Sequence, residues 1–310
     1  MNIEKVKIWL KLYGIKNILF RAINEKSPLI CVANNNLLRR MNWQLKVKKR
    51  IANYIVYPEH KELKDSEHIK KIWWLWLQGS ENAPLIVQRC LGTVKYYSAK
   101  MNFEVIELDE SNLFEYVKLP DQIVSMWKQK RITNANFSDL CRIALLADYG
   151  GLWIDSTVFL TDKIDEEILQ SDIFFYQASF LDMTVTKVSN WFMYAKNPGN
   201  YFMRSLKESM INYWMNNKYM DDYFIFHIMT AAMSEKECFR KYFENMPYFS
   251  NTYPHLLSLE LNNKVNIEKL KHILQMSNVH KLTYKNLRSS SDDKTVYQHI
   301  VSRKKGESLL

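Results

Sequence analysis

The stretch NFSDLCRIALLADYGGLWID, residues 136–155, combines a helical pattern, a double glycine and a short apolar run. Apolar side chains recur at spacings of three and four over residues 137–149, which is the period of a helix with one buried face. Ser138 is suited to begin this helix, and Gly150 can adopt the left-handed conformation that ends one. The next residues, Leu-Trp-Ile, predict a buried strand with the carboxylate of Asp155 at its carboxyl end.

Two charged residues interrupt the apolar face of this helix. Asp139 and Arg142 are three positions apart and therefore lie on the same side. A structural ion pair is one interpretation, because such pairs are common at the rim of a core. The other is a ligand site, since ligands of open α/β sheets bind beyond the carboxyl ends of strands, where Asp155 is expected. An arginine and a metal held by that aspartate could together neutralise a diphosphate.

The pattern S-D-x-x-R followed by L-L-x-x-Y-G-G-x-W-x-D resembles the nucleotide-sugar-binding core of glycosyltransferases that carry a DxD motif. More closely, residues 71–285 resemble the capsular polysaccharide synthesis glycosyltransferases. The similar blocks are IWWLWLQGSENAP, SDLCR, YGGLWIDSTVFL, SNWFMYAKNPGN, DDYFIFH and HKLTYK, in this order. Several ordered blocks are more specific than one short motif. The resemblance implies a GT-A-type fold, that is, a Rossmann-type mixed α/β sheet flanked by helices.

The resemblance also implies a site for a nucleotide diphosphate. Asp155, Thr157 and His280 are the expected ligands of a divalent metal, Mn²⁺ or Mg²⁺. Arg142 and Lys281 are expected to offset the charge of the leaving group. The chain departs from the DxD pattern because Thr157 stands where the second aspartate belongs. Metal dependence is therefore left open, although a threonine can still orient a metal-bound water.

Further binding residues are implied at the ends of two strands. In this fold the end of the first strand receives the nucleoside, which makes Trp76, Gln78 and Gly79 candidates for contacts with the base or ribose. The segment containing Asn190 and Trp191 is expected to line the sugar pocket, because an aromatic face and an amide suit a hexose ring. The alternative for each tryptophan is packing in the core.

The candidate catalytic residues are Asp139, Arg142, Asp222 and His227. Asp139 is expected to fix Arg142 or to hydrogen-bond the sugar. The DDYFIFH block places Asp222 and His227 on a predicted helix, where the carboxylate could orient an acceptor with the histidine as its partner. The structural alternative is a capping aspartate and a hydrogen-bonded core histidine.

The order of apolar segments predicts a parallel α/β unit. A strand over 71–78, a helix that begins at Pro84 and a strand over 103–108 follow one another. We expect residues 158–160 to continue the edge of this sheet. Other segments have the alternation of strands or the period of helices: strands at 173–178, 183–195 and 279–283, and helices at 119–129 and within 198–244.

The net charge of +10 lies entirely in the amino-terminal quarter of the chain. Residues 1–72 contain 16 Lys or Arg and 6 Asp or Glu, whereas the remainder contains 27 of each kind. Basic amphipathic helices are predicted over 3–21, with a break near Gly14, and over 37–57. They could pack on the domain or lie on an anionic membrane surface. No nucleic-acid-binding motif accompanies them, so we expect no nucleic-acid partner.

We therefore expect three parts: a basic helical extension (1–68), a GT-A-like domain (69–285) and a loosely held tail (286–310). Four widely spaced cysteines form no CxxC pair, and two of them lie on apolar helical faces, which favours buried free thiols in a reducing cytoplasm. They are Cys31, Cys90, Cys141 and Cys238. Neither a membrane span nor a signal peptide is expected.

The resemblance implies a hexosyltransferase of capsular or exopolysaccharide synthesis. We expect the donor to be a nucleotide-diphosphate sugar, the acceptor a lipid-linked repeat unit at the inner face of the cell membrane, and the reaction to retain configuration. Two alternatives stay open. One is a catalytically idle nucleotide-sugar-binding protein, because Thr157 replaces an aspartate. The other is a basic membrane-surface adaptor whose activity lies in the extension.

Overall fold

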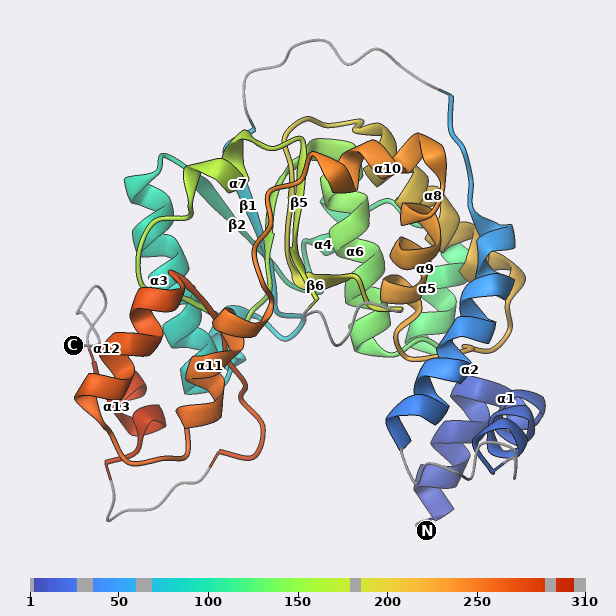
Figure 1. The fold of residues 1–310 in the computed structure, drawn as a ribbon, viewed down its shortest axis with the longest axis horizontal. Helices are drawn as coiled ribbons and strands as arrows, with labels where there is room; N and C mark the ends of the chain where they lie inside the picture. Colours follow the sequence, from blue (N-terminus) through green and yellow to red (C-terminus); the bar gives the residue numbers. More distant parts are fainter. Residues whose placement is uncertain (1–2, 27–35, 60–68, 179–184, 288–293, 304–310) are drawn as a thin grey trace.

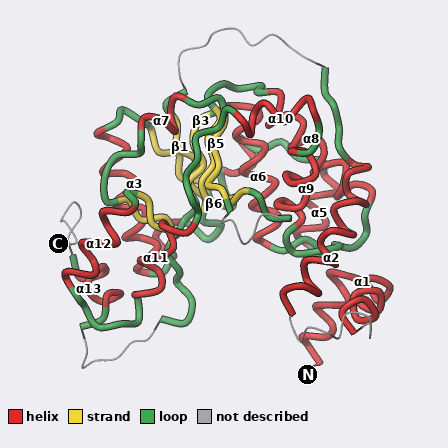
Figure 2. The backbone as a smooth tube through the Cα atoms, in the orientation of Figure 1, coloured by secondary structure: helices red, strands yellow, loops and turns green. Residues whose placement is uncertain are grey.

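The structure, a computed structural model, describes residues 3–26, 36–59, 69–178, 185–287 and 294–303. Its centre is a mixed sheet with the strand order β2-β1-β3-β6-β5 (Figures 1 and 2). β1 pairs in parallel with β2 and β3, whereas β6 is antiparallel to β3 and β5. The strands are β1 (Lys71–Leu75), β2 (Glu104–Leu108), β3 (Gly151–Ile154), β5 (Ile173–Gln177) and β6 (Val188–Ala195). The predicted mixed α/β fold is confirmed.

Helices cover both sides of the sheet (Figure 2). They are α1 (Ile3–Lys26), α2 (Asn36–Ile51), α3 (Leu85–Lys100), α4 (Leu113–Tyr116), α5 (Asp121–Lys128), α6 (Asn134–Tyr149), α7 (Glu166–Gln170), α8 (Tyr201–Asn216), α9 (Ile225–Ser234), α10 (Glu237–Glu244), α11 (Thr252–Glu260), α12 (Ile267–Met276) and α13 (Val296–Ser302). Successive side chains of a strand face opposite sides. Accordingly Trp73 joins a core with α6, α8 and α9, while Trp74 joins a second core with α3, α11 and α12.

The first strand is shorter than predicted. It ends at Leu75 because the chain then turns, with the N–H of Gly79 donating to the carbonyl of Trp76 at 2.9 Å. The β1–α3–β2 unit is parallel as expected, since Lys71 to Leu75 lie opposite Glu104 to Leu108. Within this turn the N–H of Trp76 still donates to the carbonyl oxygen of Leu108 at 3.0 Å, whereas Gln78 is exposed to solvent.

The junction of α6 and β3 depends on its two glycines. α6 begins directly after Thr133, whose side chain accepts a backbone N–H of the first turn, so the predicted start at Ser138 was wrong. Gly150 ends the helix as predicted, with φ 67°. At Gly151, with φ 88°, an added Cβ would lie 2.6 Å from the carbonyl oxygen of Lys71. Only glycine therefore lets β3 approach β1 this closely.

A second, two-stranded sheet lies beside the first. β4 (Val158–Leu160) pairs antiparallel with β7 (Val279–Lys281), and Val158 lies opposite Lys281. The expectation that residues 158–160 extend the edge of the main sheet was wrong, because the turn after β3 redirects the chain to this late strand. The pairing brings residue 281 next to the end of β3.

The two terminal parts are integral to the fold. α2 inserts Trp43, Val47 and Ile51 into the main core, so residue 68 does not separate two cores. α1 is kinked at Gly14, as predicted, where φ is 68°. Part of the tail also packs firmly: the guanidinium of Arg89 donates to a carbonyl oxygen of α13 at 3.0 and 2.7 Å.

The cysteines follow the prediction in part. Cys90 and Cys141 are buried free thiols, whereas Cys238 is free and exposed. Cys31 lies outside the described residues. Within the described ranges, none of the helices has the length and apolar character needed to cross a membrane.

Candidate active site

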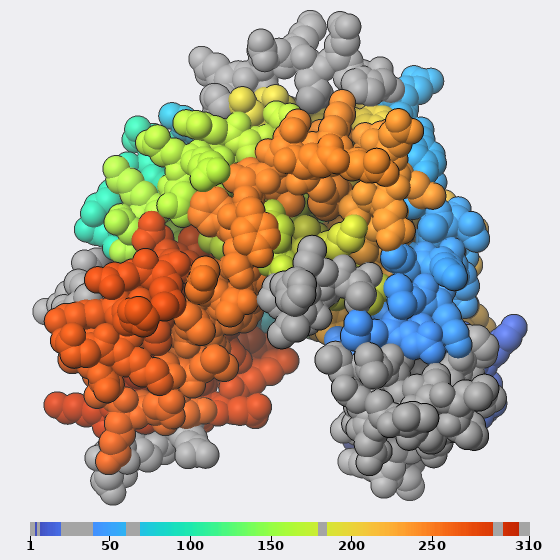
Figure 3. Space-filling view, viewed as in Figure 1, coloured from blue at the N-terminus to red at the C-terminus, as the bar shows by residue number. Residues whose placement is uncertain are grey.

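A cleft of about 730 Å³ lies beyond the carboxyl ends of β1 and β3. The space-filling view is hollowed between the C-terminal helices and α2 (Figure 3). The volume is within the range of roughly 300–1,000 Å³ that is usual for small-ligand sites. The lining includes Trp76, Gln78, Asn82, Ser138, Asp139, Arg142, Asp155, Thr157, Asn190, Trp191, Tyr223, His227, Lys281 and Tyr284.

Asp155, Thr157 and Lys281 form one cluster at the base of the cleft. The ammonium of Lys281 donates to Asp155 Oδ2 and to Thr157 Oγ1. The backbone fixes this arrangement, because the N–H of Leu282 donates to the carbonyl oxygen of Thr157 at 2.9 Å. Both charged side chains are partly open, with 19% of Lys281 and 26% of Asp155 exposed. A ligand in the cleft can therefore reach them.

Asp139, Arg142 and Asn190 form a second cluster. The amide of Asn190 donates to Asp139 Oδ1 at 2.8 Å, and its backbone carbonyl accepts from Arg142. The guanidinium also donates to the Ser138 carbonyl and hydroxyl at 3.2 and 2.9 Å, and it lies 3.5 Å from Asp139. It stacks 4.8 Å from the ring centroid of Trp153. Arg142 is thus largely committed to orienting its neighbours.

The two carboxylates of the cleft are shifted in opposite directions. Burial raises the pKa of Asp139 to about 6, against the opposing field of Arg142 and with a contribution from Asp155. Burial acts in the same direction on Asp155, but Lys281 and Arg142 outweigh it and hold the pKa of that carboxyl below its usual value. Asp155 is therefore a carboxylate at neutral pH, whereas Asp139, with a pKa of about 6, takes up a proton just below neutral pH.

The predicted nucleoside-binding residues are only partly assembled. Trp76 and Gln78 line the cleft, and the ring of Trp76 meets the edge of Tyr284 at a centroid distance of 5.5 Å. Gly79 instead shapes the turn, because its φ of 85° is a backbone conformation that other residues rarely adopt. Asn82 takes its place in the lining and hydrogen-bonds the Gln78 carbonyl at 2.8 Å.

Trp191 is mainly a core residue, although it also lines the cleft. It is 5% exposed and stacks on Tyr176 at 4.7 Å, and its Nε1–H donates to Asn251 at 2.8 Å. The polar group of this segment that faces the site is its neighbour Asn190. Adjacent residues of a strand face opposite sides of the sheet, so the strand pattern in the sequence already predicts different surroundings for Asn190 and Trp191.

Asp222 and His227 do not form the predicted pair on one helix. Asp222 precedes α9, is buried, and accepts the N–H of Phe224 at 2.9 Å, which shapes the turn. His227 does line the cleft. Burial, with Arg142 and Arg40, lowers the pKa of His227 to about 3, so its imidazole is neutral at physiological pH. Among the described residues its Nδ1 has no hydrogen-bond partner.

His280 does not reach the predicted metal site. Its ring is fully buried, with Nε2 3.2 Å from the hydroxyl of Thr161, whereas the adjacent Lys281 faces the cleft. Adjacent strand residues face opposite ways, so only one of the two can contact Asp155. Within the described part of the chain, no group of three or more His, Cys, Asp or Glu is arranged to hold a metal. The residues present do not fit the predicted divalent-ion site.

Sequence reasoning also missed several residues of the lining, among them Asn82, Tyr223 and Tyr284. Tyr223 is exposed and directly precedes Phe224 in the turn before α9. Tyr284 lies in the HKLTYK block, and its polar neighbours gave a signal that this segment borders the site. Asn82 lies in the IWWLWLQGSENAP block, where the end of the first strand was expected to supply the contacts with the nucleoside.

The fold and the cleft define an α/β protein with a polar ligand site at the carboxyl ends of its parallel strands. Residues 30–300 match the family described as "Capsular polysaccharide synthesis protein". The chain therefore belongs to the capsular polysaccharide synthesis protein family, as its sequence blocks predicted.

Similarities to individual proteins are distant. The structure described as "PaToxG Glycosyltransferase" is 13% identical, with a TM-score of 0.39, and the match covers 94% of this chain and 98% of that one. A second structure, described as a transferase mutant, is 12% identical, with a TM-score of 0.30, and the match covers 64% of this chain and 94% of that one. No curated protein is similar at a significant level. The predicted role in capsular polysaccharide synthesis agrees with the family.

Proposed function

We propose that the protein transfers a hexose from a nucleotide-diphosphate sugar to an acceptor of capsular polysaccharide synthesis. One observation carries this proposal: Lys281 and Asp155 meet at the strand ends of a cleft that Asp139 and Asn190 also line. An ammonium is a suitable partner for a diphosphate, and a carboxylate beside an amide suits sugar hydroxyls.

The cleft offers separate places for the parts of the donor. The nucleoside lies against Trp76 and Gln78, beyond the end of β1. The diphosphate lies at Lys281, where the ammonium stabilises the charge that develops on the leaving group. The hexose lies toward Asp139 and Asn190, and Arg142 orients them through an ion pair with Asp139 and a hydrogen bond to the Asn190 carbonyl. This order follows the cleft from the end of β1 to the face of α6.

The acceptor enters on the side of Tyr223 and His227. Tyr223 is 46% exposed, which gives an aromatic surface at the entrance, and the neutral imidazole can accept a proton or hydrogen-bond a hydroxyl. We propose that the acceptor is a lipid-linked repeat unit and that configuration is retained. Product analysis by NMR checks the second point, because an inverted anomer in the first product contradicts retention.

Nucleotide release tests the proposal directly. The protein is incubated with UDP-, GDP- and TDP-linked hexoses in Mn²⁺ buffer, and the released nucleoside diphosphate is quantified. We expect release from at least one donor, with a loss of roughly tenfold or more in the Asp139→Asn variant, because a charged hydrogen-bond partner is removed. Asp148→Asn is the matched control: it lies on the same helix but pairs with Lys207 at the surface.

The same assay separates the idle sugar-binding alternative. A protein that is stabilised by a donor but releases no nucleotide, with or without extracts that contain acceptor, binds without transfer. A protein that neither binds nor turns over any donor contradicts the proposal.

A further inference from the structure

We propose that Lys281 takes the place of a divalent cation at the donor diphosphate, so that nucleotide-sugar binding needs no metal. This inference rests on the proposed function, because it concerns the same cleft. It differs from the expectation drawn from the sequence, which assigned Asp155, Thr157 and His280 to a metal ion.

The position of the ammonium carries the inference. Asp155 Oδ2 and Thr157 Oγ1, the two oxygens assigned to the metal, both accept hydrogen bonds from Lys281. An ammonium has three N–H donors. These two described partners engage two of them, and the partly exposed side chain leaves the third for an oxygen atom in the cleft.

The backbone holds Lys281 in this position. β7 pairs with β4, which starts three residues after Asp155, and this pairing places Lys281 opposite Val158. The hydrogen bond from Leu282 N–H to the carbonyl of Thr157, at 2.9 Å, extends the pairing beyond the strand. A lysine fixed at its backbone loses less conformational freedom on ligand binding than one on a mobile loop.

A divalent ion is disfavoured at the same point. It would lie against the ammonium, and like charges at contact distance repel strongly in a partly buried site. It would also lack ligands: Thr157 supplies a neutral hydroxyl, and His280 is turned into the core. Asp155 and Thr157, which both accept hydrogen bonds from the ammonium, hold it at this point of the cleft.

Donor binding measured with and without metal tests the inference. The intact protein is titrated with UDP, GDP and TDP and their hexose conjugates, in EDTA and in Mn²⁺, and binding is read from thermal shift and calorimetry. We expect the dissociation constant of the best ligand to differ by less than about threefold between the two buffers. Binding that appears only in Mn²⁺, or tightens tenfold or more, overturns the inference and leaves the proposed function standing. Absence of binding in both buffers overturns both.

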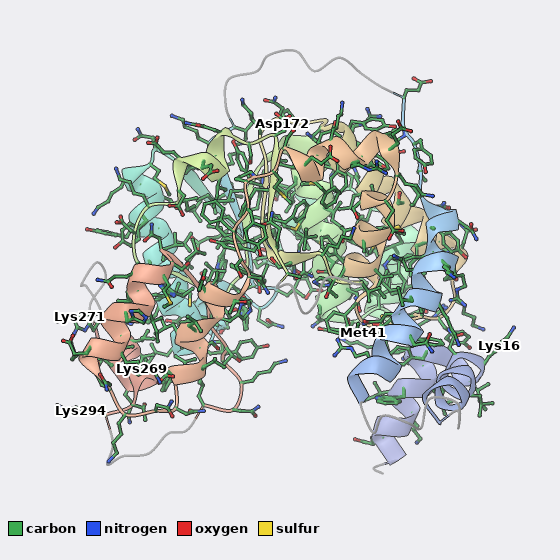
Figure 4. All side chains as sticks on the ribbon, viewed as in Figure 1. Lys16, Met41, Asp172, Lys269, Lys271 and Lys294 are labelled. Carbon is green, nitrogen blue, oxygen red and sulfur yellow. The ribbon has the colours of Figure 1, made fainter. Side chains whose placement is uncertain are left out.

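Two lysine variants distinguish a specific role of Lys281 in binding from an effect of the overall charge of the protein. Lys281→Met keeps the length of the side chain, and we expect it to weaken binding in EDTA by roughly tenfold or more, since a charge-assisted hydrogen bond is lost. The control is Lys271→Met, at the outer edge of the molecule in Figure 4, where the ammonium pairs with Glu268 at 2.9 Å. Unchanged binding by Lys281→Met in EDTA overturns the inference.

Restoring a second carboxylate gives an independent test. In Thr157→Asp combined with Lys281→Met, the two aspartates can hold a divalent ion. We expect this double variant to bind the nucleotide at least tenfold more tightly in Mn²⁺ than in EDTA. A wild type that shows the same metal preference as the double variant overturns the inference.

Discussion

Asn190 connects Asp139 and Arg142 of α6 to the sheet. Its side chain donates to Asp139 at 2.8 Å, and its main chain accepts from Arg142. Asp139 and Arg142 are each only 5% exposed, so the hydrogen bonds of their charged groups are needed to offset the cost of burial. This arrangement explains how two charges can sit on the inner face of a helix without disrupting the core.

The raised pKa of Asp139 predicts a pH dependence of stability. The pKa of this carboxyl is about 6 in the folded protein and 3.8 ordinarily, so the folded state binds the proton more tightly than the unfolded state does. Its contribution to stability is present below pH 3.8 and is lost as the pH rises through about 6, a loss of about 2–3 kcal/mol. We expect Asp139→Asn to be free of this loss. Urea unfolding at pH 5 and pH 7.5 should therefore show a smaller decline in the free energy of unfolding for the variant than for the wild type.

At the scale of elements, the turn before α9 is attached to the N-terminal helices. The carboxylate of Asp221 is buried and pairs with Arg50 of α2, and it accepts from Tyr213 and Asn17 at 3.2 and 3.3 Å. The N–H of Met220 donates to a carbonyl oxygen of α1 at 2.8 Å. The turn continues into Tyr223, so these helices support one wall of the cleft.

Breaking this attachment should destabilise the protein. Asp221→Asn keeps the shape of the side chain but removes its charge, so the ion pair with Arg50 is lost. We expect the free energy of unfolding to fall by about 1–3 kcal/mol. The loss is no larger because Arg50 is half exposed and solvent screens its charge. The control Asp148→Asn breaks a surface pair and should cost less than about 1 kcal/mol. Equal effects of the two variants in urea unfolding would show that the turn is not held by this pair.

The elements were largely predictable, whereas the contacts between distant ones were not. The helical period and the double glycine predicted α6 and β3, because each of these signals lies within the segment that it describes. The pairing of β4 with β7 joins segments about 120 residues apart, and no local pattern specifies such a partner. The role of Lys281 depends on that pairing. The sequence could have predicted that His280 and Lys281 do not both face the cleft, since adjacent residues of a strand face opposite sides.

At the scale of the whole molecule, α1 and α2 border the side on which the cleft opens (Figures 1 and 3). α1 exposes apolar side chains together with lysines: Ile8, Trp9, Leu10, Ile15 and Leu19, with Lys7, Lys11 and Lys16. Such a surface suits an anionic bilayer. We propose that the protein attaches peripherally to the inner face of the cell membrane, with the cleft toward a lipid-linked acceptor.

Vesicle flotation tests this attachment. We expect binding to vesicles with anionic lipid and much weaker binding to neutral ones, because each basic residue near an anionic surface contributes about 1 kcal/mol. Trp9→Asp with Ile15→Asp should reduce flotation, whereas Tyr96→Asp, at an exposed position of α3, should leave it unchanged. Equal flotation with neutral and anionic vesicles would contradict the membrane proposal.

The central claim is that the Lys281–Asp155 cluster receives the diphosphate of a nucleotide sugar. A crystal structure with the nucleoside diphosphate that stabilises the protein most would test it most directly. We predict a β-phosphate oxygen within about 2.7–3.2 Å of Lys281 Nζ, with the position of the sugar directed toward Asp139. A nucleotide bound elsewhere, for example in the cleft of about 520 Å³ beside Lys70, Lys100 and Lys163, would contradict the account.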